Sequence, residues 1–305
     1  MAFPIQYSNE VSNAKAGQLP IVALESTIIS HGMPFPENLR VAMEVEDLVR
    51  VNGAVPATIA ILEGQIHVGL ESSELEDFAS RSSVMKCSRR DLALAISEKR
   101  NGATTVAATM IIAEMAGIHV FATGGIGGVH RNAEFTFDIS ADLTELARTN
   151  VAVVSAGAKA ILDLPKTLEY LETMGVPVIG YGTNEFPAFY SRTSGLNLTI
   201  NLDSPHKIAA FLKAKWDMDI AGGAVIANPI PLASELDSNL MEQHIRAAIL
   251  EASHMGIGGK ELTPYLLKYL NSATAGLSQN ANKALVLNNA ALAAKIASAF
   301  NILSA

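Results

Sequence analysis

The sequence contains a single cysteine, Cys87, among 305 residues. One cysteine excludes a disulfide within the chain and a zinc site built from several cysteines. Proteins of this kind are typical of a reducing compartment, so we expect a cytoplasmic location.

Long apolar runs and an excess of positive charge are also missing. No stretch reaches the roughly 18 consecutive apolar residues of a membrane-spanning helix, and residues 1–16 lack the apolar segment of a signal peptide. The formal net charge is −8, and the basic residues between Arg81 and Arg100 lie in an otherwise acidic chain. We therefore expect neither a nucleic-acid nor a membrane partner, whereas a small phosphorylated ligand stays compatible because one pocket needs few cations.

Apolar residues make up 49% of the chain and charged residues only 17%, which predicts a large core. Short β-branched runs alternate with segments of helical periodicity. We expect strands at 21–24, 58–62, 65–69, 118–122, 151–154, 176–180 and 224–227, and helices at 36–52, 89–99, 104–115, 141–149, 160–173 and 290–300. The alternation predicts an α/β protein with three α/β/α layers and a largely parallel or mixed central sheet. Residues 20–305 are expected to form a single catalytic domain, preceded by an N-terminal arm at 1–19.

Lys159 follows the predicted strand 151–154 and has apolar neighbours on both sides. Apolar surroundings disfavour the charged form of an amine, and a neutral amine attacks the carbonyl carbon of a sugar. The alternative is a lysine at the start of a helix that extends its ammonium group to solvent.

Glu25 and Thr123 follow two other predicted strands, at 21–24 and 118–122. Ligands of parallel sheets bind at the carboxyl ends of strands, so these side chains are expected near Lys159. A carboxylate there would transfer protons; the alternative is a core ion pair or a helix cap.

Two glycine-rich stretches do not match nucleotide-binding motifs. In the loop 124–128 the third glycine of the dinucleotide fingerprint would fall on His130, and in the stretch 258–261 Glu261 replaces the Ser or Thr of a phosphate-binding loop. These glycines indicate either close backbone approach or tight turns.

The segment 130–142 is the densest polar patch. Asp138 lies between two apolar residues, and one carboxylate among waters can hold Mg²⁺ or Mn²⁺. Ser140 is a good cap for the helix at 141–149, whose N-terminus could bind phosphate or could simply be capped. Lys86 precedes another helix start and is either an anion contact or a surface cation.

Six segments carry a resemblance to a known family: residues 23–36, 122–131, 137–143, 155–164, 227–231 and 259–264. They closely resemble the pseudouridine-5′-phosphate glycosidases, also called the indigoidine synthase A-like family. The resemblance runs from about residue 20 to the C-terminus.

This resemblance implies reversible cleavage of the C–C glycosidic bond of pseudouridine 5′-phosphate to uracil and ribose 5-phosphate, by an enzyme classed as a pseudouridylate synthase among the carbon–oxygen hydro-lyases. It implies that Lys159 forms a Schiff base with the opened ribose, that Glu25 is the general acid and base, and that Asp138 holds one Mn²⁺, or another divalent ion, in each subunit. It further implies a homotrimer. The implied substrate contacts are Lys86, Val106, Thr123, His130, Ser140, Ala141, Asp142 and Asn282.

Three other functions stay open on the residues. One is a Schiff-base aldolase or another sugar-phosphate lyase that uses Lys159. Another is a module that binds a nucleotide or sugar phosphate without chemistry, and the third is an accessory protein of pigment biosynthesis.

Overall fold

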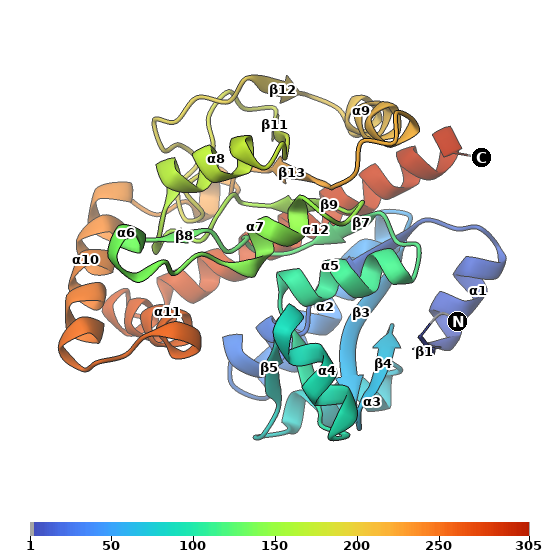
Figure 1. Ribbon diagram of the computed structural model, residues 1–305, viewed down its shortest axis with the longest axis horizontal. Helices are drawn as coiled ribbons and strands as arrows, with labels where there is room; N and C mark the ends of the chain where they lie inside the picture. Colours follow the sequence, from blue (N-terminus) through green and yellow to red (C-terminus); the bar gives the residue numbers. More distant parts are fainter. Residues whose placement is uncertain (1–2, 305) are drawn as a thin grey trace.

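An eleven-stranded sheet forms the centre of the protein over residues 3–304, the part of the chain that this computed structural model describes (Figure 1). Its spatial order is β1-β4-β3-β2-β7-β9-β13-β11-β12, with β6 on β3 and β5 on β6. From β3 to β12 all neighbours on this path are parallel, whereas β3 pairs antiparallel with β4 and β6. The strands are β1 (Ile5–Tyr7), β2 (Ile21–Leu24), β3 (Val55–Leu62), β4 (Gln65–Val68), β5 (Met85–Cys87), β6 (Gly102–Thr104), β7 (Val120–Ala122), β9 (Ala152–Ser155), β11 (Val178–Tyr181), β12 (Ile200–Leu202) and β13 (Ala224–Ala227).

Helices cover both faces of the sheet, which confirms the predicted α/β/α layers. One face carries α2 (Glu37–Val51), α9 (Pro205–Asp217) and α12 (Leu277–Ser304), and α12 packs against both of the others. The near face in Figure 1 carries α5 (Val106–Met115), α7 (Ala141–Leu146) and α8 (Leu164–Thr173). The remaining helices are α1 (Asn9–Ala16), α3 (Ser72–Ser80), α4 (Arg89–Ser97), α6 (Ala133–Thr136), α10 (Ser238–His254) and α11 (Leu262–Ala273), with short helical turns at Ile28–Gly32, Leu232–Ser234 and Gly259–Glu261.

The helix α12 is long and apolar enough to cross a membrane by length and composition alone. Half of its most apolar window is buried inside the protein, where it packs against α9, α2, β7 and β9. This is typical of a core helix, and the burial lies within one chain.

The helix predicted at 160–173 begins later, at Leu164. Asp163 caps it by accepting a hydrogen bond from the Lys166 amide, and Pro165 occupies its first turn, a position that suits proline. The preceding pair Leu162–Asp163 forms β10, which pairs antiparallel with β8 (Val129–His130). The predicted helix start was therefore wrong, and Lys159 lies in a turn rather than at the beginning of a helix.

The segment expected to be an N-terminal arm contributes β1 and α1 over its described residues. β1 adds to the sheet by parallel pairing with β4. Val11 and Ala14 of α1 are almost fully buried. This part of the chain thus packs against the same core as the rest.

Candidate active site

Three neighbouring parallel strands, β2, β7 and β9, bring the predicted reactive residues to one edge of the sheet. Glu25 directly follows β2, Thr123 directly follows β7, and Lys159 lies in the turn after β9. The register aligns the carboxyl ends of these strands, with Leu24 beside Ala122 and Ala122 beside Val154. The expected convergence at the strand ends is therefore present.

Glu25 is held by one hydrogen bond and faces a mostly apolar pocket. The Thr123 hydroxyl donates to Oε1 of Glu25. Burial raises the pKa of Glu25; the positive charges of Lys159 and Lys86 and the Thr123 hydrogen bond oppose this rise, while the negative charge of Asp142 adds to it. A carboxyl group whose pKa is raised retains its proton closer to neutral pH, as a general acid requires.

Lys159 is half-buried, and its backbone is fixed on both sides. Its amide donates to the Ile126 carbonyl at 3.1 Å, and its carbonyl accepts from the Leu162 amide at 3.0 Å. No residue in the described range forms a hydrogen bond or ion pair with its Nζ, yet its charge acts on Glu25, Lys86 and His130. The amine is therefore close to all three groups and is not committed to a carboxylate.

Lys86, on β5, and His130, on β8, complete the site. Burial lowers the pKa of Lys86, and the charge of Lys159 lowers it further, against the opposing effects of Glu25, Asp142 and Glu261. Burial also lowers the pKa of His130, against the charge of Asp138. Two ammonium groups that repel each other form a site that an anion would stabilise.

The glycine loop at 124–128 is shaped by Asp142. The Asp142 carboxylate is buried, and its two oxygens accept hydrogen bonds from the Ala107 and Gly127 amides, both at 2.8 Å. A Cβ at Gly127 would lie 2.2 Å from Oγ of Ser140 and 2.7 Å from Oδ2 of Asp142. Gly127 therefore serves close backbone approach, one of the two alternatives that the sequence left open.

Ser140 caps α7 as predicted, by accepting a hydrogen bond from the Asp142 amide at 3.3 Å. Ala141 is the first residue of that helix and is half-buried. Val106 is the first residue of α5 and is buried. The next residue, Ala107, donates its amide to the Asp142 carboxylate. The turn 140–142 and the start of α5 thus meet at the glycine loop.

Asn282 reaches the same loop from α12. Its Oδ1 lies 3.1 Å from where a Cβ on Gly124 would stand. This contact brings the C-terminal helix to the strand ends, although Asn282 is 123 positions from Lys159 in the sequence.

Asp138 lies in the loop between α6 and α7, half-buried between the exposed Phe137 and Ile139. Its carbonyl accepts from the His130 amide at 3.0 Å, and its carboxylate forms no hydrogen bond with any other described residue. The described residues contain no group of three His, Cys, Asp or Glu side chains that could hold a metal. Asp138 therefore fits only a divalent ion that keeps most of its water, as Mg²⁺ and Mn²⁺ can.

Sequence reasoning missed two residues that support the site. Asn289 of α12 is fully buried; its Nδ2 donates to the Thr123 carbonyl at 2.8 Å, and its Oδ1 accepts from Nδ2 of Asn228 at 3.0 Å. Arg131 forms two 2.8 Å hydrogen bonds with Glu242 and donates to the carbonyl of Ala160, the residue after Lys159. An amide within an apolar helix was the available signal for Asn289; for Arg131 there was none beyond its place in a matching segment.

The chain is similar to known proteins over nearly its whole length. A family model described as indigoidine synthase A like protein matches residues 10–299. The chain is 60% identical over 288 residues to a pseudouridine-5′-phosphate glycosidase of Solibacter usitatus, covering 94% of this chain and 96% of that protein. It is 58% identical over 300 residues to a protein of the same name from Petrotoga mobilis, covering 98% of each.

Two solved structures share the fold over nearly the whole chain. One is the prealnumycin C-glycosynthase AlnA in complex with ribulose 5-phosphate, with a TM-score of 0.91, 40% identity and 98% coverage of both chains. The other is an indigoidine synthase A-like protein of Thermotoga maritima, with a TM-score of 0.90 and 34% identity, covering 99% of this chain and 98% of that one.

Proposed function

Because the chain belongs to the indigoidine synthase A like family, we propose that it reversibly cleaves the C–C glycosidic bond of pseudouridine 5′-phosphate, giving uracil and ribose 5-phosphate. Relatives that are 56–60% identical to it carry the name of that activity. A C–C bond has no leaving heteroatom, so the carboxylate pair of ordinary glycosidases cannot break it by protonating an oxygen. The reaction needs an amine that opens a covalent route and an acid that protonates carbon.

The disposition of the Asp142 and Glu25 carboxyl groups is the observation that supports this chemistry best. Both oxygens of Asp142 accept backbone hydrogen bonds, so Asp142 is not available as a nucleophile. Glu25 has one oxygen bound by Thr123 and retains its proton more readily than an ordinary glutamate. One acid and one uncommitted amine, Lys159, then remain at the strand ends.

In the proposed cleavage, the Lys159 amine bonds to C1′ as the C1′–O4′ bond of the ribose opens and O4′ takes a proton. Glu25 then protonates C5 of the uracil ring. The C1′–C5 bonding electrons leave with uracil as the nitrogen lone pair forms the iminium at C1′. Water hydrolyses this Schiff base to ribose 5-phosphate and restores the amine, so one water is consumed for each bond cleaved.

Lys86, His130 and the turn 140–142 are proposed to bind the phosphorylated sugar, together with Val106, Thr123 and Asn282. Lys86 supplies a charge that a phosphate would stabilise, since burial and Lys159 both lower its pKa. A Mn²⁺ held by Asp138 and waters would supply further positive charge near an anionic substrate. A homotrimer is also proposed, and light scattering of the purified protein tests it.

The decisive experiment incubates the protein with pseudouridine 5′-phosphate and Mn²⁺, measures uracil release, and traps any Schiff base with borohydride for intact-mass spectrometry. Wild type should release uracil and gain the mass of a reduced pentose phosphate. Lys159→Ala should do neither, whereas Lys166→Ala, at an exposed lysine of α8, should behave as wild type. Glu25→Gln should form the adduct but stall before uracil leaves.

Each alternative predicts a different result. Uracil release without a trapped adduct would exclude the lysine route. An adduct with ribose 5-phosphate but no uracil release would favour another sugar-phosphate lyase. Binding without turnover in the wild type would favour a module without chemistry.

A further inference from the structure

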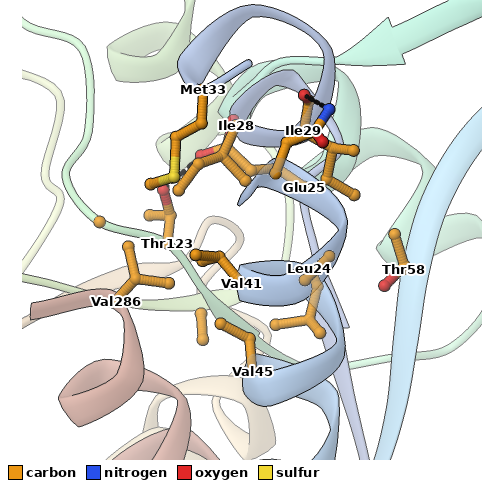
Figure 2. A pocket seen from close by; sticks show the side chains of 14 residues that line it. Leu24, Glu25, Ile28, Ile29, Met33, Val41, Val45, Thr58, Thr123 and Val286 are labelled. Atoms are coloured by element: carbon orange, nitrogen blue, oxygen red, sulfur yellow. Dashed lines mark hydrogen bonds between the residues drawn. The ribbon is translucent and has the colours of Figure 1, made fainter. Parts of the chain in front are cut away.

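A small pocket lies directly beside Glu25, on the side of the sheet that α2 and α12 cover. Its volume is about 30 Å³, and Figure 2 shows the Glu25 and Thr123 side chains at one end of it. Most other lining side chains are hydrocarbon or thioether groups from the segment 28–33, from α2 and from α12: Ile28, Ile29, Met33, Val41, Val45 and Val286.

Apart from a protonated Glu25, the polar side chains of this pocket have no hydrogen-bond donor left for a guest. Thr58 donates to Glu46 at 2.6 Å, and Asn38 donates to the carbonyls of Ile29 and Ala79 at 2.8 and 2.9 Å. A buried water needs roughly 10–15 Å³ and typically about three hydrogen bonds. The pocket therefore has space for about two waters but almost no partners to hold them, so it stays dry.

We propose that this apolar pocket is part of the catalytic apparatus, because it keeps water away from one face of the acid that protonates the uracil carbon. The inference rests on the proposed role of Glu25 and adds the residues that make that role possible. A carboxylate beside hydrocarbon is less well solvated than a carboxylate in water, so the neutral acid is favoured. Burial is the largest cause of the raised pKa of Glu25, and the pocket accounts for the hydrocarbon on that side.

The charged groups that face Glu25 all come from other directions. They are Lys159 in the turn after β9, Lys86 on β5 and Asp142 on α7. The pocket-lining side chains that α2, α12 and the turn Ile28–Gly32 contribute carry no charge. Polar substitutions in the pocket therefore change the solvation of Glu25 without changing the charges around it.

Two variants test the proposal by bringing a polar group into the pocket. Met33→Gln keeps the length of the side chain and replaces the thioether with an amide. Val41→Thr replaces one methyl group with a hydroxyl. A threonine within a helix can donate this hydroxyl to the carbonyl four residues earlier instead of into the pocket, so Met33→Gln is expected to have the larger effect on Glu25. The matched control is Val49→Thr, which makes the same change on the same helix at a buried residue that does not line the pocket.

The first readout is the pH dependence of kcat for uracil release. The active form of Glu25 is protonated, so turnover falls as pH rises through its pKa. In Met33→Gln and Val41→Thr this fall should begin at lower pH; a decrease of about one pKa unit costs roughly tenfold in turnover above the wild-type pKa. Borohydride trapping at Lys159 should stay at the wild-type level, and Val49→Thr should keep the wild-type profile. The proposal would be overturned if both pocket variants showed the same pH profile as Val49→Thr and unfolded at a similar temperature.

A second readout does not depend on the reaction. Carbon-13 labelling of the glutamate carboxyls, with Glu25→Gln to assign the signal, reports the titration of Glu25 directly by NMR. The pKa should be lower in Met33→Gln than in wild type, and an equal value would overturn the proposal even if the protein cleaves no pseudouridine 5′-phosphate. Absence of uracil release in the wild type, with the expected NMR shift present, would instead reject only the proposed function.

Discussion

Replacing Asp142 by Asn separates a structural role for this residue from a substrate contact. The carboxylate is 5% exposed and accepts two backbone hydrogen bonds, from the Ala107 and Gly127 amides. An asparagine can accept only one of them, and its amide nitrogen then faces the other N–H. The variant therefore loses one charge-assisted hydrogen bond and leaves a buried donor unsatisfied, which costs about 1.5–3 kcal/mol.

Urea unfolding at one fixed protein concentration measures this cost, since the concentration dependence that subunit association would introduce is then the same for both proteins. The control is Asp47→Asn on α2, an exposed carboxylate paired with Arg50, which should change the free energy of unfolding by less than about 0.5 kcal/mol. If Asp142 instead contacts substrate through its carboxylate, Asp142→Asn should raise KM and leave the free energy of unfolding unchanged. That result would refute the structural reasoning.

Three further variants or treatments test the electrostatics, the metal and the position of the amine. Glu25→Gln should gain stability relative to wild type as pH rises from 4 to 7. Burial raises the pKa of Glu25, so the folded wild type keeps a proton that the unfolded chain releases in this window, and the wild type loses stability as pH rises. An equal difference in the free energy of unfolding between the two proteins at pH 4 and pH 7 would contradict this. Strong chelation or Asp138→Ala should lower turnover, and Mn²⁺ should restore the chelated wild type; no effect of chelation would reject the metal assignment. Arg131→Lys keeps the positive charge, but a lysine cannot donate two hydrogen bonds to Glu242 and a third to the Ala160 carbonyl in the geometry of the arginine. Single-turnover trapping at Lys159 should therefore slow by about ten- to a hundredfold. A wild-type trapping rate would count against this positioning role.

The central strands could be predicted because they are buried on both faces. β7, β9 and β13 therefore read as continuous apolar runs. Turns and helix caps could also be predicted, because they depend on neighbouring residues. Glu63 and Gly64 both take positive φ in the two-residue turn between β3 and β4, a position that favours glycine. Ser88 forms a capping box at α4.

The parts that failed depend on contacts between distant segments. β8 and β10 are two residues long and are strands only because they pair with each other; a two-residue stretch carries no periodicity, so the helix predicted at 160–173 began too early. Asp142 was predicted as a substrate contact from the family resemblance, and its backbone partners, which lie 35 and 15 positions away in the sequence, were not foreseen. Val106 and Asn282 entered the candidate site through the family resemblance alone, because nothing in their local sequence distinguishes them.

The charges of the site also couple phosphate binding to the acid. A phosphate dianion beside Lys86 adds negative charge near Glu25, and negative charge raises the pKa of a carboxyl group. The bound phosphate should therefore help Glu25 retain the proton that it delivers to the uracil carbon, in addition to contributing affinity. Pseudouridine without its phosphate is then expected to show a lower kcat as well as a higher KM, roughly tenfold in kcat for each pKa unit lost. Steady-state kinetics with both substrates at several pH values measures this, and the deficit should shrink at lower pH, where Glu25 is protonated without help. An increase in KM alone, with the same kcat at every pH, would show that the phosphate only anchors the substrate.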